Sequence, residues 1–217
     1  MFNRFGNIGD WTSERILLVY SFALTSYGAA KTLFCGFENF PFHMLRTGDF
    51  DRLLLRPVSL FTQVSASVFN FHRAANFVAG LIIMAISLHR LHTEISFVNL
   101  AMIMSALLGG ILLYTGVFIL GAGIGFFTIN ALDWVFIFNH NSVELARIPV
   151  DHMPVFLRKT FTFLMPMLVI SYFPSAAISW GGSFWRGWLA LPVGAAFFNV
   201  SLVFWKIGVK RYKSTGS

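Results

Sequence analysis

The chain has 217 residues, of which 56% are hydrophobic, 17% aromatic and only 12% charged. Soluble domains carry about 25% charged residues, so this composition excludes an ordinary soluble protein and predicts an all-α, polytopic helical membrane protein. The net charge of +7 does not indicate nucleic-acid binding, because no basic face with interleaved aromatic residues lies outside the apolar segments. It fits Lys and Arg side chains that hold a membrane topology.

Five apolar segments are predicted to cross the membrane as one domain over residues 1–217, each close to the roughly 20 residues that span a bilayer. They cover residues 14–37, 64–90, 95–127, 160–180 and 188–205. The second is apolar only from Ala74 to Leu88, so we expect its helix to extend backwards toward residue 64. The fourth contains Pro166 and Pro174, each of which removes a backbone donor and is expected to bend or break the helix.

Lys31 is a charged residue within the first span. We expect its side chain to snorkel to the nearby membrane surface, with a role in a transport path as the alternative. Cys35 is the only cysteine, which excludes an intrachain disulfide and a thiolate metal cluster.

Residues 38–63 form a charged stretch between the first two spans, and we expect them to lie in water at one membrane face. The charges are too dense for hydrocarbon; they are Arg46, Asp49, Asp51, Arg52 and Arg56. Thr47-Gly48-Asp49 predicts a turn and a helix start at Asp49, and Pro57 ends that helix at Arg56. Phe50, Leu53 and Leu54 share one face, which indicates a short amphipathic helix on the membrane surface.

The third span is rich in small residues, and Gly121 and Gly125 form a pair that favours close helix packing, with another chain as the expected partner. In the fifth span, Asn199 is expected to donate a hydrogen bond to another helix.

Residues 128–159 form a second polar loop with Glu144 and Arg147, and residues 206–217 a basic tail. Counting Lys and Arg places both loops and the tail in the cytoplasm by the positive-inside rule. Five spans then leave the amino terminus outside, which is unusual without a signal peptide and leads us to expect a further helix upstream.

Chemistry is sparse in this sequence. There is no phosphate-binding GxxxxGK[ST] string, so ATP hydrolysis by the chain itself is not expected. His89, His92 and Glu94 do not have convincing metal-ligand spacing, and no metal or other cofactor is predicted.

Four strings carry a resemblance to a known family. They are TGDFDRLLLRPVSLFTQ at 47–63, ELARIPV at 144–150, FLMPMLVISYFP at 163–174 and FWKIGVKRYKSTGS at 204–217. Together they resemble the bacterial ABC-2 family transporter permeases, in a branch once catalogued as a domain of unknown function. The resemblance covers nearly the whole chain, which opens after the position of the family's first helix.

The resemblance implies a multi-pass membrane subunit of an ATP-driven exporter in the bacterial plasma (inner) membrane. Its partners would be the lipid bilayer, a cytoplasmic ATPase subunit and a second permease chain, identical or different. The segment from Gly48 to Pro57, with Asp49, Asp51, Arg52 and Arg56 as contacts, then becomes the candidate element that receives ATPase motion. Glu144 and Arg147 are the secondary candidates. The alternative is a membrane scaffold or assembly subunit without a transport path.

Overall fold

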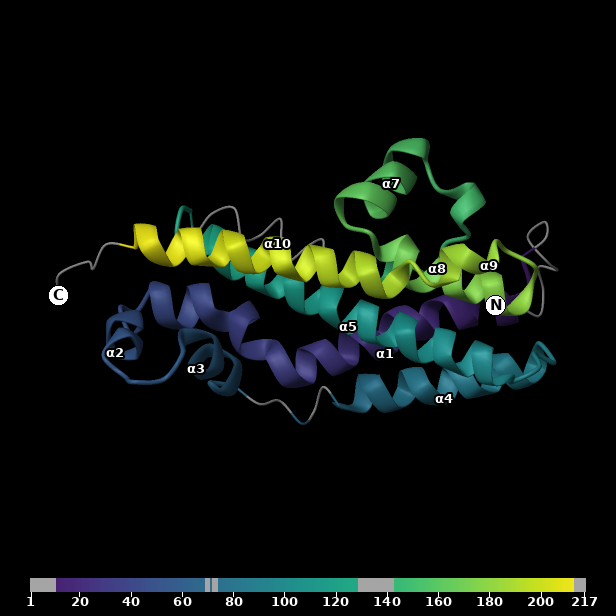
Figure 1. Ribbon diagram of the computed structural model, residues 1–217, viewed down its shortest axis with the longest axis horizontal. Helices are drawn as coiled ribbons and strands as arrows, with labels where there is room; N and C mark the ends of the chain where they lie inside the picture. The colour runs from purple at the N-terminus through teal and green to yellow at the C-terminus, as the bar shows by residue number, and fades with distance from the viewer. Residues whose placement is uncertain (1–10, 69–70, 72–73, 129–142, 213–217) are drawn as a thin grey trace.

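The computed structural model describes residues 11–68, 71, 74–128 and 143–212, and its long elements are helices (Figure 1). Four of them form an elongated bundle: α1 Ser13–Phe40, α4 Ala74–Arg90, α5 Phe97–Gly125 and α10 Ala190–Arg211. Helix α5 packs between α10 and α1, and α4 covers α1. Shorter elements connect them: η1 Pro41–Leu45, α2 Phe50–Leu54, α3 Leu60–Ala66, η3 Val150–His152, α7 Val155–Lys159, η4 Thr160–Leu164, α8 Met167–Ser179 and α9 Phe184–Gly187.

A seam of small residues, spaced seven apart on both helices, joins α5 to α10. Gly109, Gly116 and Gly123 face α10, and Gly194, Ser201 and Gly208 face α5. A methyl group on Gly109 would overlap the carbonyl of Ala190, so the backbones approach as closely as they do only because no Cβ is present. Both helices run in the same direction along this seam.

Glycines also bring α1 and α4 together, in antiparallel orientation. A methyl group on Gly28 would overlap the backbone of Phe77, and one on Gly80 would overlap Thr25.

The two ends of the bundle carry different elements. The α2 end holds α2, α3 and the last turns of α1, α5 and α10; the α9 end holds α9, Trp11 and the last turn of α4 (Figure 1).

Within the residues that the structure describes, three helices are long and apolar enough to cross a membrane: the α1–η1 unit, α5, and the α9–α10 unit. The fourth predicted span is broken. Its two parts, residues 155–164 and 167–179, meet at an angle of 97°, because Met165 and Pro166 leave helical geometry. Pro174 lies inside α8 without ending it, so only one of the two prolines breaks the chain direction.

The second predicted span differs too. Helix α4 has only 17 residues, and residues 60–66 form the separate helix α3, so the expected backward extension is wrong. Helix α8 starts near the middle of the bundle, where Ile170 lies beside Gly110, and ends at the α9 end, where Trp180 contacts Trp11. Helix α7 projects from the side of the bundle (Figure 1).

Candidate coupling site

The charged stretch between α1 and α4 folds into two short helices that cover the α2 end. Gly48 has φ +79°, a left-handed conformation that suits glycine and turns the chain into α2. Helix α2 spans Phe50–Leu54, shorter than the predicted 49–56 because Leu55 and Arg56 form a turn before Pro57. Asp49 stands at the N-cap position, but its carboxylate caps no backbone N–H; it accepts a hydrogen bond from Thr47 Oγ1 at 2.8 Å.

The charged side of this segment faces solvent. The Arg52 side chain is 82% exposed and its Nη1 lies 3.2 Å from the Asp49 carboxylate, whose side chain is 48% exposed. Arg56 is exposed as well. Since exposed ion pairs contribute only about 0–1 kcal/mol, this pair does little for the fold and leaves both groups accessible to a partner.

The apolar side is anchored by Phe50, which is fully buried. It belongs to an aromatic cluster formed by Phe37, Phe40, Phe50, Phe126, Trp205 and Tyr212. The Phe50 ring lies 5.3 Å from Phe40 in α1, 5.4 Å from Phe126 at the end of α5 and 4.8 Å from Tyr212 after α10. A single side chain of α2 thus contacts the ends of three bundle helices.

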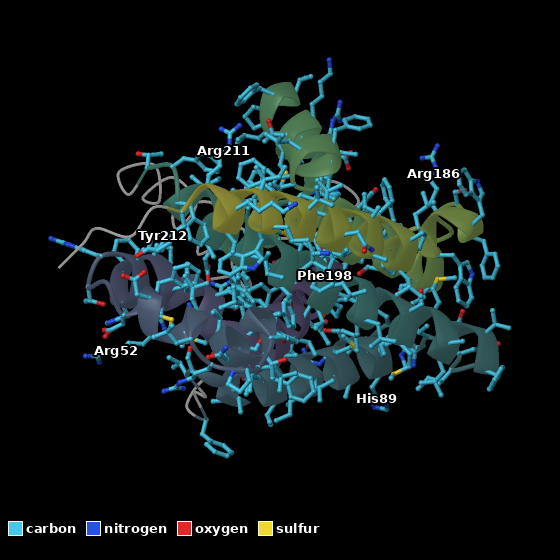
Figure 2. The ribbon with its side chains drawn as sticks, turned by 60° about the vertical axis from the view of Figure 1, so that its left-hand side comes forward. Arg52, His89, Arg186, Phe198, Arg211 and Tyr212 are labelled. Carbon is cyan, nitrogen blue, oxygen red and sulfur yellow. The ribbon has the colours of Figure 1, made fainter. Side chains whose placement is uncertain are left out.

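Tyr212 adds a link between the tail and the charged side of α2. Burial and the neighbouring Asp51 carboxylate raise the pKa of Tyr212 above its usual value. Figure 2 shows Tyr212 and Arg52 at the same end of the molecule, with Arg186 at the other.

Helix α3 holds the turn after α2 in place. Gln63 Nε2 donates to the carbonyl oxygens of Leu53, at 3.1 Å, and Val58, at 2.7 Å. A methyl group on Gly36 of α1 would overlap the Val64 carbonyl, so α3 lies directly on α1. Helices α2 and α3 therefore form a folded platform, attached to α1, α5 and α10, with charged residues on its outer surface.

A family model described as an ABC-2 family transporter protein matches residues 1–216. The chain belongs to the ABC-2 transporter family. It is a multi-pass membrane protein of the permease type, in agreement with the predicted class. No curated protein and no solved structure is similar enough to this chain to count as a match.

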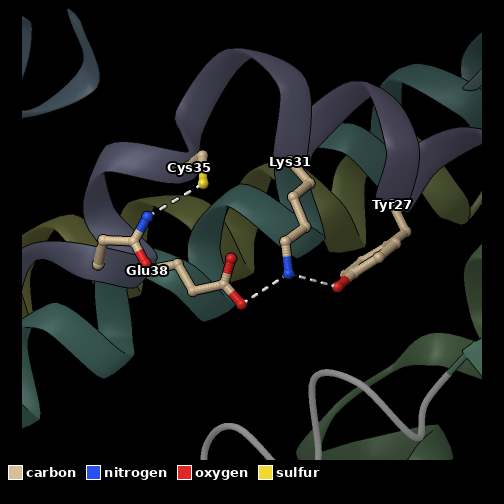
Figure 3. Close-up of polar contacts among 5 residues, drawn as sticks. Tyr27, Lys31, Cys35 and Glu38 are labelled. Atoms are coloured by element: carbon tan, nitrogen blue, oxygen red, sulfur yellow. Dashed lines mark hydrogen bonds and ion pairs between the residues drawn. The ribbon is translucent and has the colours of Figure 1, made fainter. Parts of the chain in front are cut away.

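In the part of α1 that packs against α3, this ABC-2 protein buries an ion pair (Figure 3). Lys31 Nζ lies 2.9 Å from Glu38 Oε1 and donates to the Tyr27 hydroxyl at 2.9 Å. The two charged side chains are only 7% and 9% exposed. The Lys31 side chain therefore does not snorkel to the surface but is neutralised inside the protein. Phe34, between the pair, has non-helical φ and ψ and bends α1.

Glu144 and Arg147 lie away from the platform, in the half of the bundle nearer the α9 end, whereas the sequence predicted one shared face. Arg147 Nη2 donates to the Tyr20 hydroxyl at 2.6 Å, its guanidinium covers the Tyr20 ring at 4.3 Å, and Nη1 pairs with Glu144 at 2.9 Å. Nearby, Trp11 Nε1 donates to Asp151 at 2.9 Å. Trp11 lies at the α9 end and Tyr20 in the half of α1 nearer that end, so these side chains do not join Asp49, Asp51, Arg52 and Arg56.

The remaining predicted residues have local partners. Gly121 is buried within the chain, and a methyl group on Gly125 would overlap the Pro41 side chain, so both help pack α5 against its own chain. Asn199 is exposed and donates to the Ala195 carbonyl of its own helix at 2.8 Å, so the expected bond to another helix is absent. In the described residues, His, Cys, Asp and Glu side chains form no group able to hold a metal ion.

Proposed function

We propose that the chain is a membrane-spanning permease subunit of an ATP-driven exporter and that its platform couples it to a separate cytoplasmic ATPase. Family membership supports the transporter role. The coupling role rests on the position of α2, which has exposed Asp49 and Arg52 on one side and buried Phe50 on the other. A push on the exposed side reaches α1, α5 and α10 through direct ring contacts, as transmission through packed side chains requires.

In this proposal the α2 end faces the cytoplasm of a bacterial cell and the chain lies in the plasma membrane. Basic residues support that orientation, because the α2 end carries Arg46, Arg52, Arg56, Lys206, Lys210 and Arg211. A second permease chain, identical or different, completes the path. Helix α10 offers a face for it, since Val200, Val203 and Ile207 are exposed and lie on one side of the helix.

The coupling role is tested by charge reversal on the platform. The full chain is tagged and purified in mild detergent from membranes of its own host, and retained ATPase is measured with wild-type protein, Arg52→Glu and Arg56→Glu. Exposed substitutions change stability by only about 0.5 kcal/mol, so both variants should insert at normal abundance. We expect them to lose the ATPase, and the loss to depend on ionic strength, because interface charges act on association.

Arg186→Glu is the matched control, since Arg186 is an exposed arginine at the α9 end. It should retain the ATPase. Equal retention in all four proteins would contradict the coupling role of the platform. A chain that never retains an ATPase under any condition would favour the scaffold or assembly function instead.

A further inference from the structure

An apolar groove of about 570 Å³ runs between α3 and the last three turns of α10. Its walls include Phe61 from α3 with Phe198 and Leu202 from α10, and the Phe61 and Phe198 rings are 6.5 Å apart. The groove volume is typical of small-molecule sites, which occupy about 300–1,000 Å³. Phe198 marks one end of the groove, near the middle of α10 in Figure 2.

Among the described residues, the charged ones that line the groove are two lysines at its other end. Lys206 and Lys210 are one helical turn apart on α10, both are exposed, and neither forms an ion pair within the described part of the chain. No acidic side chain of the described residues lines the groove. Its remaining lining is apolar or aromatic, with residues Leu60, Phe61, Phe198, Leu202, Trp205 and Val209.

We propose that this groove binds an anionic phospholipid, with one acyl chain against the aromatic walls and the phosphate between Lys206 and Lys210. From Phe198 to Lys210 the helix rises about 18 Å. That length matches one leaflet of the hydrocarbon core, about 15 Å. The two ammonium groups then stand at headgroup depth, where basic residues attract anionic lipids.

The lining favours a lipid over a peptide. A peptide would bring backbone N–H groups into the groove, and these need acceptors when they are buried. The lining side chains that the structure describes supply ammonium donors and no carboxylate, amide or hydroxyl acceptor. An acyl chain with an anionic head needs no acceptor and satisfies both lysines. Because α3 is part of the platform, the bound lipid would also hold the platform against α10.

Lipid binding is measured on the purified full chain. Native mass spectrometry counts bound phosphatidylglycerol and bound phosphatidylcholine with the same acyl chains, at increasing lipid concentration. We expect wild-type protein to prefer phosphatidylglycerol. Removing a basic residue near the headgroups weakens anionic-lipid binding about fivefold, so Lys206→Gln/Lys210→Gln should lose about 25-fold in preference. Lys206→Arg/Lys210→Arg should keep it.

Two further variants separate this site from general charge attraction. Arg158→Gln/Lys159→Gln removes the same charge from exposed α7 and should keep the full preference. Leu202→Trp fills the groove without touching the lysines and should weaken the binding of phosphatidylglycerol. Soluble glycerophosphoglycerol, which has the head but no chains, should not compete. The proposal is overturned if the lysine pair and the α7 pair behave alike, or if Leu202→Trp binds as wild type.

Discussion

At the scale of single residues, the pair formed by Lys31 and Glu38 shows how α1 tolerates charge in an apolar helix. Residues seven apart lie on the same face, about 10 Å apart along the axis, which the two long side chains bridge. The contact of 2.9 Å, together with the Tyr27 hydroxyl, leaves neither charge unpaired. Removing one of the two charged side chains therefore lowers the free energy of unfolding far more than removing both.

We predict that Lys31→Met lowers the free energy of unfolding by about 3 kcal/mol, because it leaves the Glu38 carboxylate buried without its partner. The double variant Lys31→Met/Glu38→Gln should lose less than the single one. Unfolding by sodium dodecyl sulfate in mixed micelles measures both, and a double-mutant cycle gives the coupling. The exposed pair of Asp49 and Arg52 is the control, with coupling below about 1 kcal/mol. Equal coupling in the two pairs would contradict the burial argument.

A change at Phe50 distinguishes the transmission of ATPase motion to the bundle from the binding of the ATPase to the platform. Phe50→Ala removes the contacts with Phe40, Phe126 and Tyr212 but leaves Asp49 and Arg52 in place. We predict that this variant still retains the ATPase but fails to change its hydrolysis rate in proteoliposomes, with a stability loss of about 3 kcal/mol. Leu54→Ala, on the same helix but 47% exposed, should behave as wild type. Normal rate control in Phe50→Ala would rule out transmission through the aromatic cluster.

At the scale of elements, hydropathy predicts the long helices well, because α1, α5 and α10 are each apolar over a full span. It fails where tertiary contacts decide. Helix α3 separates from α4 because its residues pack on Gly36 of α1, and the sequence contains no signal for that contact. The seam between α5 and α10 could have been predicted, since glycines recur every seven residues in α5. The four-residue spacing of Gly121 and Gly125 instead pointed to another chain, whereas both residues are buried within this one.

The candidate site shows the same limit. The alternation of apolar and charged residues in α2 predicted its exposed and buried sides correctly, with Arg52 exposed and Phe50 buried. The aromatic partners of Phe50 come from residues 40, 126 and 212, which no local pattern connects. The bend at Phe34 is equally invisible, because phenylalanine has no strong tendency to break helices.

The seam between α5 and α10 predicts different outcomes for substitutions at Gly116 and at Gly109. A side chain added at Gly116 meets the Phe197 ring, which can be shortened, whereas one added at Gly109 meets the Ala190 backbone, which cannot. Both Gly116→Leu and Gly109→Leu should destabilise the chain by about 3 kcal/mol in the detergent unfolding assay, because overpacking forces the helices apart. Adding Phe197→Ala should restore part of the stability of Gly116→Leu only.

Leu108→Phe is the control for the seam, since Leu108 is 51% exposed and lies outside the seam. It should unfold as wild type does. If Phe197→Ala rescued both glycine variants equally, the close approach at Gly109 would not be the cause of its loss.

At the scale of the whole molecule, the arrangement of the ends revises the topology. Thr128 follows α5 at the α2 end, whereas Arg147 and Asp151 contact Tyr20 and Trp11, in the half of the bundle nearer the α9 end. The charge count assigned residues 128–159 to one cytoplasmic loop. Because Arg147 lies nearer the α9 end, it no longer counts with the basic residues of the α2 end. The difference in Lys and Arg between the two ends is therefore smaller than the sequence predicted, although the α2 end still has more basic residues.

Single-cysteine labelling distinguishes the two topologies, using a background in which buried Cys35 is replaced by Ala. His152→Cys is the decisive position, because His152 is exposed and follows Asp151, the partner of Trp11. Leu55→Cys, 85% exposed, reports the α2 end, and Ser183→Cys, also exposed, reports the α9 end. We predict that an impermeant maleimide labels positions 152 and 183 from the same side of the membrane, and position 55 only from the other.

The reagent is added to intact cells and to inverted vesicles, so each position is read from both sides. Labelling of position 152 together with position 55 would restore the loop predicted from charge and would contradict the contacts of Arg147 and Asp151. Labelling with position 183 would place Glu144 and Arg147 on the side away from the platform. A cytoplasmic ATPase at the α2 end could then reach only one of the two candidate segments, the one built around Phe50.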